Sequence, residues 1–212
     1  GKTDKIFEGN GPGLNCKVTA QQEFFGGCAG NIAYGLKLLK TPCLLLSLAG
    51  TEDFRRYAQH LNHHLSGVLS VKGMHCAKAN IITDPNGTQF TAFSPGPEVD
   101  KATWATHLQN QPFGSMDIFV CAPFPIPLMQ SALEITKASN PNIFNLWVPG
   151  QYADSMQADE LRIAVKACDL LVGNAHEIDH IKRTAPGCLT GKSVSETDGA
   201  RPVRALLSDG NQ

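Results

Sequence analysis

The segment FGGCAGNIAYGL, at residues 25–36, holds the side chains whose types and spacing best suit the binding of a small ligand. Gly26 and Gly27 can adopt backbone angles that other residues avoid, and they let a ligand approach the main chain closely. Asn31 lies in the first turn of the helix that the apolar spacing predicts, and its amide both donates and accepts hydrogen bonds. This combination suits a polyhydroxyl ligand better than a charged one. A glycine-rich turn with Asn31 as a helix cap would give the same pattern, so these residues alone leave both interpretations open.

A second polar pair stands later in the chain, in the segment GNAHE at residues 173–177. Asn174 and Glu177 are three residues apart, so on a helix they share a face. An amide and a carboxylate placed this way can orient water around a hard cation such as Mg²⁺. A helix start in which Asn174 caps the backbone and Glu177 is its reciprocal partner would look the same. The pair therefore indicates either a cation-ordering site or a capping box.

Both polar segments adjoin elements that a parallel sheet would position. An apolar run at residues 43–48 predicts a strand covered on both faces, and helical spacing follows at residues 54–65. Strand and helix patterns then alternate, with strands expected at 117–122, 143–148, 169–173 and 205–208 and helices at 127–139 and 158–168. This alternation predicts right-handed crossovers and a mainly parallel α/β sheet. Ligands of such sheets bind outside the carboxyl ends of the strands, where both polar segments are expected.

A β-hairpin interrupts this alternation at residues 79–93, with its turn around Asn86 and Gly87. An Asn-Gly pair between two alternating segments is a strong short-range hairpin signal. The pattern does not say whether the hairpin stands apart or forms an edge of the main sheet.

The segment GGCAGNIA, followed by CLLLSLAG, resembles the N-terminal signature of the ribokinase-like (PfkB) family of sugar and nucleoside kinases. The matching positions are Gly26, Gly27, Ala29, Asn31, Ala33 and, at the expected distance, Gly50. Lys40 departs from the pattern, which usually has Gly or Ser there. Within the family the segment is most similar to prokaryotic adenosine and other nucleoside kinases. The resemblance implies that Gly26, Gly27 and Asn31 hold the hydroxyls of the sugar or ribose.

The resemblance also implies an ATP site with Mg²⁺. Asn174 and Glu177 match the family's Asn-x-x-Glu motif, which assigns them to ATP and phosphate binding and assigns Glu177 to Mg²⁺ through water. Ser208 and Gly210 resemble a Thr-x-Gly turn that contacts ATP phosphates. The family's catalytic aspartate, at the end of a glycine-rich helix start, is not found in these 212 residues and is expected beyond Gln212.

The fold implied is a single, incomplete ribokinase-like α/β kinase domain over residues 1–212, with a mainly parallel β-sheet flanked by helices. A small β lid is expected from residues 14–19 and 76–95, which in the family often forms a homodimer contact. The reaction implied is transfer of phosphate from ATP to a hydroxymethyl group of a nucleoside, adenosine first, or of a sugar. The alternative is a non-catalytic protein that keeps the fold for ligand binding or dimerisation.

Composition excludes several other classes of protein. A net charge of −1 gives no electrostatic footprint for nucleic acid, and no apolar run approaches the ~18 residues that a membrane helix requires. The seven cysteines are scattered without a CxxC spacing, which indicates free thiols in a reducing cytoplasm.

Two further patterns are weaker indications of a functional site. His60, His63 and His64 lie close together on one predicted helix, but a zinc site would need a fourth ligand, so a solvated polar face is the preferred interpretation and a zinc protein the alternative. Only three residues separate Gly187 from Gly191, whereas a phosphate-binding P-loop needs four. Residues 187–193 are therefore expected to form a basic surface loop.

Overall fold

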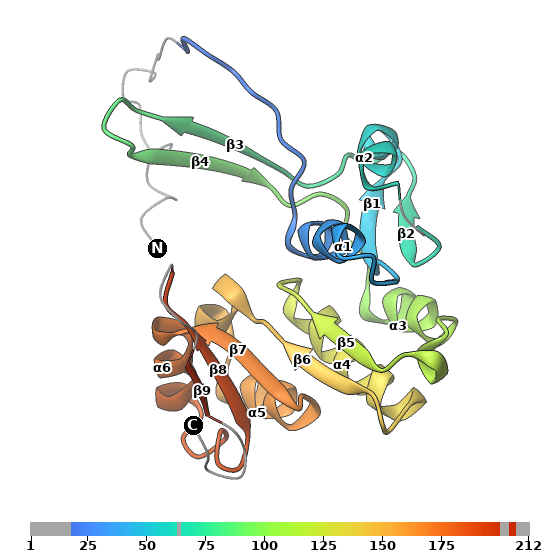
Figure 1. Ribbon diagram of the computed structural model, residues 1–212, viewed down its shortest axis with the longest axis vertical. Coiled ribbons are helices and arrows are strands. Elements are labelled where there is room, and N and C mark those ends of the chain that lie inside the picture. Colours follow the sequence, from blue (N-terminus) through green and yellow to red (C-terminus); the bar gives the residue numbers. More distant parts are fainter. Residues whose placement is uncertain (1–17, 63–64, 200–203, 207–212) are drawn as a thin grey trace.

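The computed structural model describes residues 18–62, 65–199 and 204–206, and a five-stranded sheet forms its larger part (Figure 1). The strands stand in the order β5–β6–β7–β8–β9, with β5 to β8 parallel and β9 antiparallel to β8. They are β5 (Ile118–Cys121), β6 (Phe144–Trp147), β7 (Leu170–Asn174), β8 (Ser193–Thr197) and β9 (Arg204–Leu206). The predicted mainly parallel α/β sheet is confirmed.

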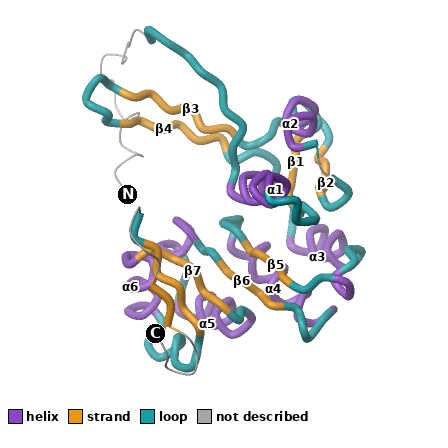
Figure 2. The backbone as a smooth tube through the Cα atoms, in the orientation of Figure 1, coloured by secondary structure: helices purple, strands orange, loops and turns teal. Residues whose placement is uncertain are grey.

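Helices precede β5 and separate the four parallel strands along the chain, as Figure 2 shows. They are α3 (Lys101–Gln109), α4 (Ile126–Ser139), α5 (Ala158–Ala167) and α6 (Ala175–Thr184), with short 3-10 helices η1 (Phe113–Ser115) and η2 (Gly150–Ser155). Neither α3 nor β8 was expected from the sequence. α3 begins where the Asp100 carboxylate accepts the Thr103 N–H, a short-range cap that favours a helix without an apolar period. β8 reads SVSET, and its pairing with β7 and β9 decides its structure.

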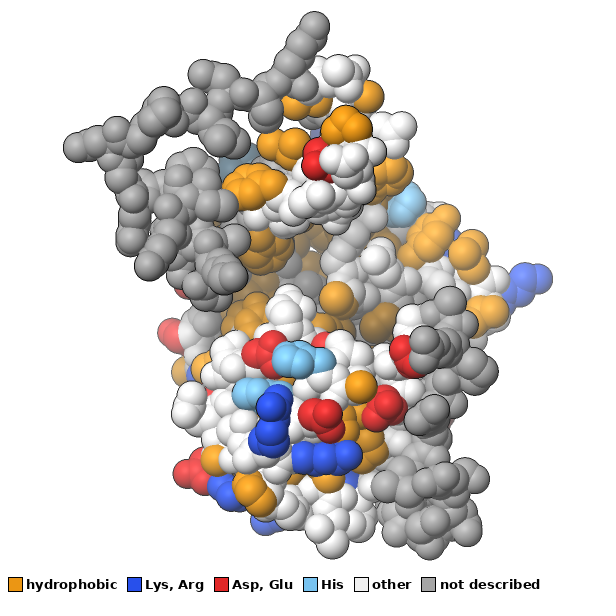
Figure 3. Space-filling view, turned by 90° about the vertical axis from the view of Figure 1, so that its left-hand side faces the viewer, with side chains coloured by type: hydrophobic (Ala, Val, Ile, Leu, Met, Phe, Trp, Pro, Cys, Tyr) orange, Lys and Arg blue, Asp and Glu red, His pale blue; other side chains and the backbone are white. Residues whose placement is uncertain are grey.

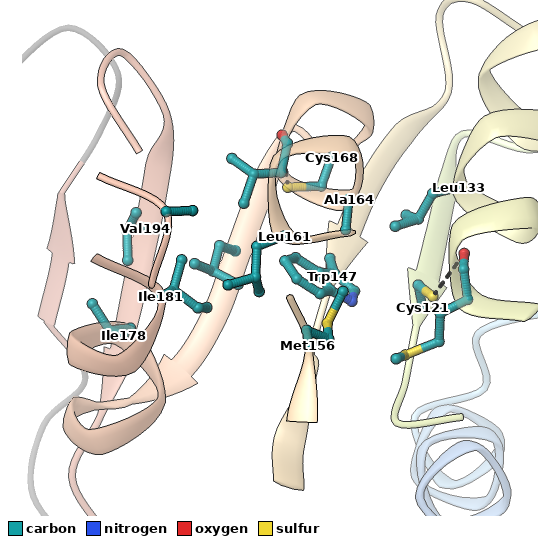
Figure 4. Close-up of a cluster of buried hydrophobic side chains, with 14 residues drawn as sticks. Cys121, Leu133, Trp147, Met156, Leu161, Ala164, Cys168, Ile178, Ile181 and Val194 are labelled. Atoms are coloured by element: carbon teal, nitrogen blue, oxygen red, sulfur yellow. Dashed lines mark hydrogen bonds between the residues drawn. The ribbon is translucent and has the colours of Figure 1, made fainter. Parts of the chain in front are cut away.

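The main hydrophobic core joins this sheet to α4, α5 and α6 (Figure 4). Trp147, Leu161 and Leu171 are fully buried at its centre. A second cluster lies around Trp104 of α3 and Leu128 of α4, whose contact includes a hydrogen bond from the Trp104 indole to the Leu128 carbonyl. Burial on this scale is the main favourable term in folding, so we regard the sheet region as the rigid part of the molecule.

The N-terminal part begins with α1 (Cys28–Leu38) and α2 (Phe54–Leu61), beside a separate parallel pair of strands. These strands are β1 (Ser47–Gly50) and β2 (Val68–Val71). A strand was expected at residues 43–48, but β1 begins only at Ser47. The apolar residues before it serve packing and not strand pairing, since Leu45 is buried against α1 and α2. The helix expected to reach residue 65 ends at Leu61, since Asn62 adopts a left-handed conformation with φ 43°.

The hairpin consists of β3 (Lys78–Thr83) and β4 (Gln89–Ser94), which pair with each other alone among the described residues. It extends away from the rest of the molecule (Figure 1), so the alternative of an edge of the main sheet is wrong. The predicted turn is present, since Gly87 has φ +85° and the Asp84 carboxylate accepts the N–H groups of Asn86 and Thr88. Of the strand expected at 14–19, residues 14–17 lie outside the described part and 18–19 are not in a strand. None of the described helices is long and apolar enough to cross a bilayer.

Candidate functional site

The start of α1 leaves its polar groups unused. Gly27 is the N-cap residue, and no side chain caps the first turn. The Asn31 backbone N–H donates to the Gly27 carbonyl at 2.9 Å, while the Asn31 side chain is exposed and has no hydrogen-bond partner within the part of the chain that the structure describes. The interpretation of Asn31 as a cap is therefore wrong. Its amide remains available to a ligand beside the backbone N–H groups of the first turn.

The two glycines before α1 are surrounded by open space. A Cβ atom at Gly26 or at Gly27 would meet no atom within 4 Å. Gly27 has φ +87°, a conformation that side chains rarely adopt, so the backbone itself requires glycine there. Neither packing nor a positive φ requires glycine at Gly26. The main chain at Gly26 is therefore bordered by open space.

The start of α6 is arranged differently. The Asn174 side chain accepts the Glu177 N–H at 2.9 Å, and the Glu177 carboxylate accepts the Asn174 N–H at 3.1 Å. In a third hydrogen bond, the Asn174 side-chain amide donates to the other Glu177 oxygen at 2.9 Å. The capping box considered from the sequence is thus present. Capping uses only part of the acceptor capacity of a carboxylate, and Glu177 is partly exposed, so it can still accept hydrogen bonds from water.

The two helix starts lie on the same side of the sheet. The parallel strands β5 to β8 place their carboxyl ends at one edge, and α6 begins directly after β7 at that edge. Figure 1 shows α1 and the hairpin on the side to which this edge points. In Figure 3 a recess with hydrophobic side chains is visible between the hairpin side of the molecule and the sheet below. Ligands of parallel sheets bind on this side, outside the carboxyl ends of the strands.

The structure describes only some of the remaining predicted residues. Ser208 and Gly210, like His63 and His64, lie outside the described residues. The His60 ring stacks on Phe25 at 4.4 Å and on Tyr34 at 4.9 Å between ring centroids. In the described ranges no three His, Cys, Asp or Glu side chains form a group suited to a metal ion.

The loop at residues 187–193 leads into β8 and not into a helix. Gly187 and Gly191 both have positive φ values, of 77° and 70°, as turn residues do. The rejection of a P-loop is therefore confirmed.

Two contacts near the site could not be read from the sequence. The Tyr57 hydroxyl of α2 donates a hydrogen bond to the Gly26 carbonyl, 31 residues earlier. Beside the first turn of α6, the His176 ring lies 3.3 Å from an Asp154 oxygen of η2. Both contacts join segments far apart in the chain, and no local pattern signals them.

The carboxylate of Asp53 links the start of α2 to the root of the hairpin. It accepts the Cys76 N–H at 2.7 Å and contacts the Lys78 ammonium at 2.8 Å and the His75 ring at 3.2 Å. Burial alone would raise the pKa of Asp53, but the hydrogen bond from Cys76 and the ion pair with Lys78 outweigh it, so this pKa lies well below its usual range. The hairpin root is thus held by charge-assisted hydrogen bonds.

Comparison with known proteins decides the family. The sequence model of the pfkB family of carbohydrate kinases matches residues 1–194. The chain belongs to this family. It is 24% identical over 172 residues to a nucleoside kinase of Methanocaldococcus jannaschii, in a match that covers 79% of this chain and 54% of that protein. The chain thus spans about half the length of this curated relative.

Solved structures of pfkB-type and related kinases share the fold of this family member. A Burkholderia thailandensis nucleoside kinase in complex with inosine superposes with a TM-score of 0.78 at 22% identity, covering 95% of this chain and 66% of that one. An Arabidopsis thaliana ribokinase complexed with ribose and ATP gives a TM-score of 0.71 at 14% identity, covering 95% and 69%. The ribokinase-like α/β fold predicted from the sequence is confirmed.

Proposed function

We propose that this protein is an ATP-dependent kinase that phosphorylates a hydroxymethyl group of a nucleoside, with adenosine as the first choice, or of a sugar. The observation that carries the proposal is the start of α1, which no side chain caps and which lies on the carboxyl side of a parallel sheet. Gly26 and Gly27 there border open space, and the Asn31 amide has no partner among the residues that the structure describes. Membership of the pfkB family and the similarity to proteins named nucleoside kinase support this choice of substrate class.

In this proposal the ribose or sugar hydroxyls bind at Gly26, Gly27 and Asn31. The backbone N–H groups of the first helical turn have no partner within the helix, so they can donate to hydroxyl oxygens. The Asn31 amide can donate to one hydroxyl and accept from another. No acidic residue stands in the first turn of α1 itself.

We place the phosphates of ATP near the start of α6, with Asn174, Glu177, Ser208 and Gly210 as the binding residues. Mg²⁺ prefers oxygen ligands and keeps several waters, and the partly exposed Glu177 carboxylate suits a contact through such a water. Bound Mg²⁺ would neutralise charge on the transferred phosphate. The aspartate that accepts the hydroxyl proton is expected beyond Gln212.

We propose that the hairpin is the lid and also a homodimer contact. All six residues of β3 are exposed, and an isolated two-stranded hairpin is marginally stable in water. Ile81 and Phe93 lie on one face, with 54% and 62% of their surface exposed, while the paired Ile82 and Phe90 lie on the other. One apolar face can cover the substrate and the other can contact a second copy.

A cytoplasmic location completes the proposal. The six cysteines within the described residues are free thiols, as expected in a reducing compartment.

The test is calorimetric titration of the full-length protein with adenosine, inosine and ribose, with and without ATP and Mg²⁺. We expect Asn31→Ala to weaken binding of the preferred nucleoside about 10-fold or more, because one amide supplies two hydrogen bonds. Asn142→Ala is the matched control, since Asn142 is also exposed and far along the chain from α1. Unchanged nucleoside affinity in Asn31→Ala would contradict the site, and binding without phosphate transfer would favour the non-catalytic alternative.

A further inference from the structure

The side chain of Tyr57 connects α2 to the glycine turn that precedes α1. Its hydroxyl donates to the Gly26 carbonyl at 2.5 Å. Burial raises the pKa of Tyr57, and a smaller contribution from Cys76 acts in the same direction. The hydroxyl therefore stays protonated and keeps its ability to donate.

Gly30 makes this contact possible. A Cβ atom at Gly30 would lie 1.8 Å from the Tyr57 hydroxyl oxygen, which is far inside any contact distance. Gly30 is also buried, whereas Gly26 and Gly27 are exposed with open space around them. The glycines of this segment thus differ in their surroundings, because Gly30 makes room for the tyrosine whereas Gly26 and Gly27 border open space.

The aromatic ring of Tyr57 is fixed by its neighbours. Phe25, the residue before the glycine turn, stacks on Tyr57 with 5.4 Å between ring centroids and on His60 at 4.4 Å. Phe54 contacts the same tyrosine edge-on at 6.3 Å. The turn is therefore held at two points, by the Phe25 ring on one side and by the Gly26 carbonyl on the other.

Holding the Gly26 carbonyl also orients the next amide. The described chain contains no cis peptide bond, and in a trans peptide the N–H group points opposite to the C=O group. With the Gly26 carbonyl directed at Tyr57, the Gly27 N–H is directed away from α2. This N–H has no backbone partner among the described residues.

We propose that Tyr57 is a positioning residue for substrate, which fixes the Gly26–Gly27 peptide so that the Gly27 N–H meets a hydroxyl of the nucleoside or sugar. This inference rests on the proposed function. It adds a residue of α2 that does not touch the substrate but sets the geometry of the donors that do. Preorganised donors bind more tightly because the ordering of the turn is complete before the ligand arrives.

The experiment compares Tyr57→Phe with Tyr34→Phe in the full-length protein. Tyr57→Phe keeps the ring, its stacking and the space above Gly30, and removes only the hydroxyl. Tyr34→Phe is the matched control, because Tyr34 stacks on His60 but its hydroxyl has no partner among the described residues. We expect KM for the nucleoside to rise about 5-fold to 10-fold in Tyr57→Phe alone, with kcat, KM for ATP and the melting temperature close to those of the wild type.

The possible outcomes distinguish the positioning role of Tyr57 from the proposed function. If nucleoside KM in Tyr57→Phe stays within 2-fold of wild type while Asn31→Ala weakens binding, the positioning role is overturned and the proposed function stands. A joint shift of kcat, both KM values and the melting temperature would indicate a general disturbance and would also overturn the positioning role. If Asn31→Ala leaves nucleoside affinity unchanged, the proposed function fails and this inference fails with it.

Discussion

The N-terminal region, residues 18–99, and the sheet region, residues 100–199, are held together in different ways. The sheet region encloses a large core around Trp147, in which the side chains are fully buried. The buried part of the N-terminal region at α1 and α2 is a small cluster of Ala33, Leu45 and Leu61.

Polar contacts compensate for the small core of the N-terminal region. Asp53 binds the root of the hairpin, and Tyr57 binds the turn before α1. The Lys37 ammonium donates to the Leu61 carbonyl at 3.0 Å and so joins the ends of α1 and α2. Single polar contacts contribute little each, so this region can move more readily than the sheet. The difference is that the sheet region depends on one large buried core, whereas the N-terminal region depends more on individual polar contacts.

The largest effect on stability is expected from Asn145→Ala in the sheet region. Asn145 is completely buried, and its amide donates to the carbonyls of Leu133 and Ala167 while Thr136 contacts its oxygen. Removing it deletes both hydrogen bonds at a fully buried position, although the Leu133 carbonyl keeps the Thr136 hydroxyl as a partner, and should lower the free energy of unfolding by about 3 kcal/mol. Urea denaturation followed by tryptophan fluorescence measures this loss, because Trp104 and Trp147 both lie in the sheet region.

Asn142→Ala is the control for this change, since Asn142 is exposed three residues before the buried position. It should alter the free energy of unfolding by less than about 0.5 kcal/mol. A loss below about 1 kcal/mol in Asn145→Ala would mean that the network is dispensable and that the contrast between the two regions is overstated.

An effect of intermediate size, confined to the hairpin root, is expected when the Asp53 carboxylate is neutralised. Because its pKa in the folded protein is depressed, the carboxylate stabilises the hairpin root above the unfolded pKa of about 3.9, and this contribution is lost as the pH falls through the lower folded value. At pH 6 we expect amide hydrogen exchange at residues 73–78 to be about 10-fold faster in Asp53→Asn than in wild type. The difference should shrink steadily below about pH 4.

Exchange at residues 143–148 supplies the internal reference, because this strand segment lies in the sheet region. Asp159→Asn is the matched variant, since the Asp159 side chain is 93% exposed and pairs with Arg162 of its own helix. If Asp53→Asn accelerates exchange equally in both segments, the hairpin root is not a separate unit.

Some elements and contacts of these two regions could be predicted from the sequence, and others could not. Apolar runs and helical spacing located β5, β6, β7, α4 and α5 to within a few residues, because local pattern and tertiary packing agree there. The polar strand β8 was missed, since its pairing partners and not its own residues determine it. At the site, Gly27 and Asn31 were found from a local motif, whereas Tyr57 reaches Gly26 across 31 residues and Asp53 binds Cys76 across 23. Contacts of this kind depend on the relative placement of whole helices, which periodicity does not encode.

The smallest effect is expected at Lys40, the position that departs from the family pattern. Lys40 has φ 57°, a left-handed conformation that costs a residue with a side chain about 1 kcal/mol. Glycine avoids this strain but loses more backbone entropy on folding, so Lys40→Gly should stabilise the protein by about 0.5 kcal/mol, measurable as a higher urea midpoint. Asn62→Gly is the matched comparison, because Asn62 has φ 43° but asparagine tolerates this conformation, and its gain should be smaller. A lower midpoint in Lys40→Gly would show that the lysine side chain contributes more than its backbone strain costs. A higher one would show that the left-handed conformation after α1 costs Lys40 more than its side chain contributes.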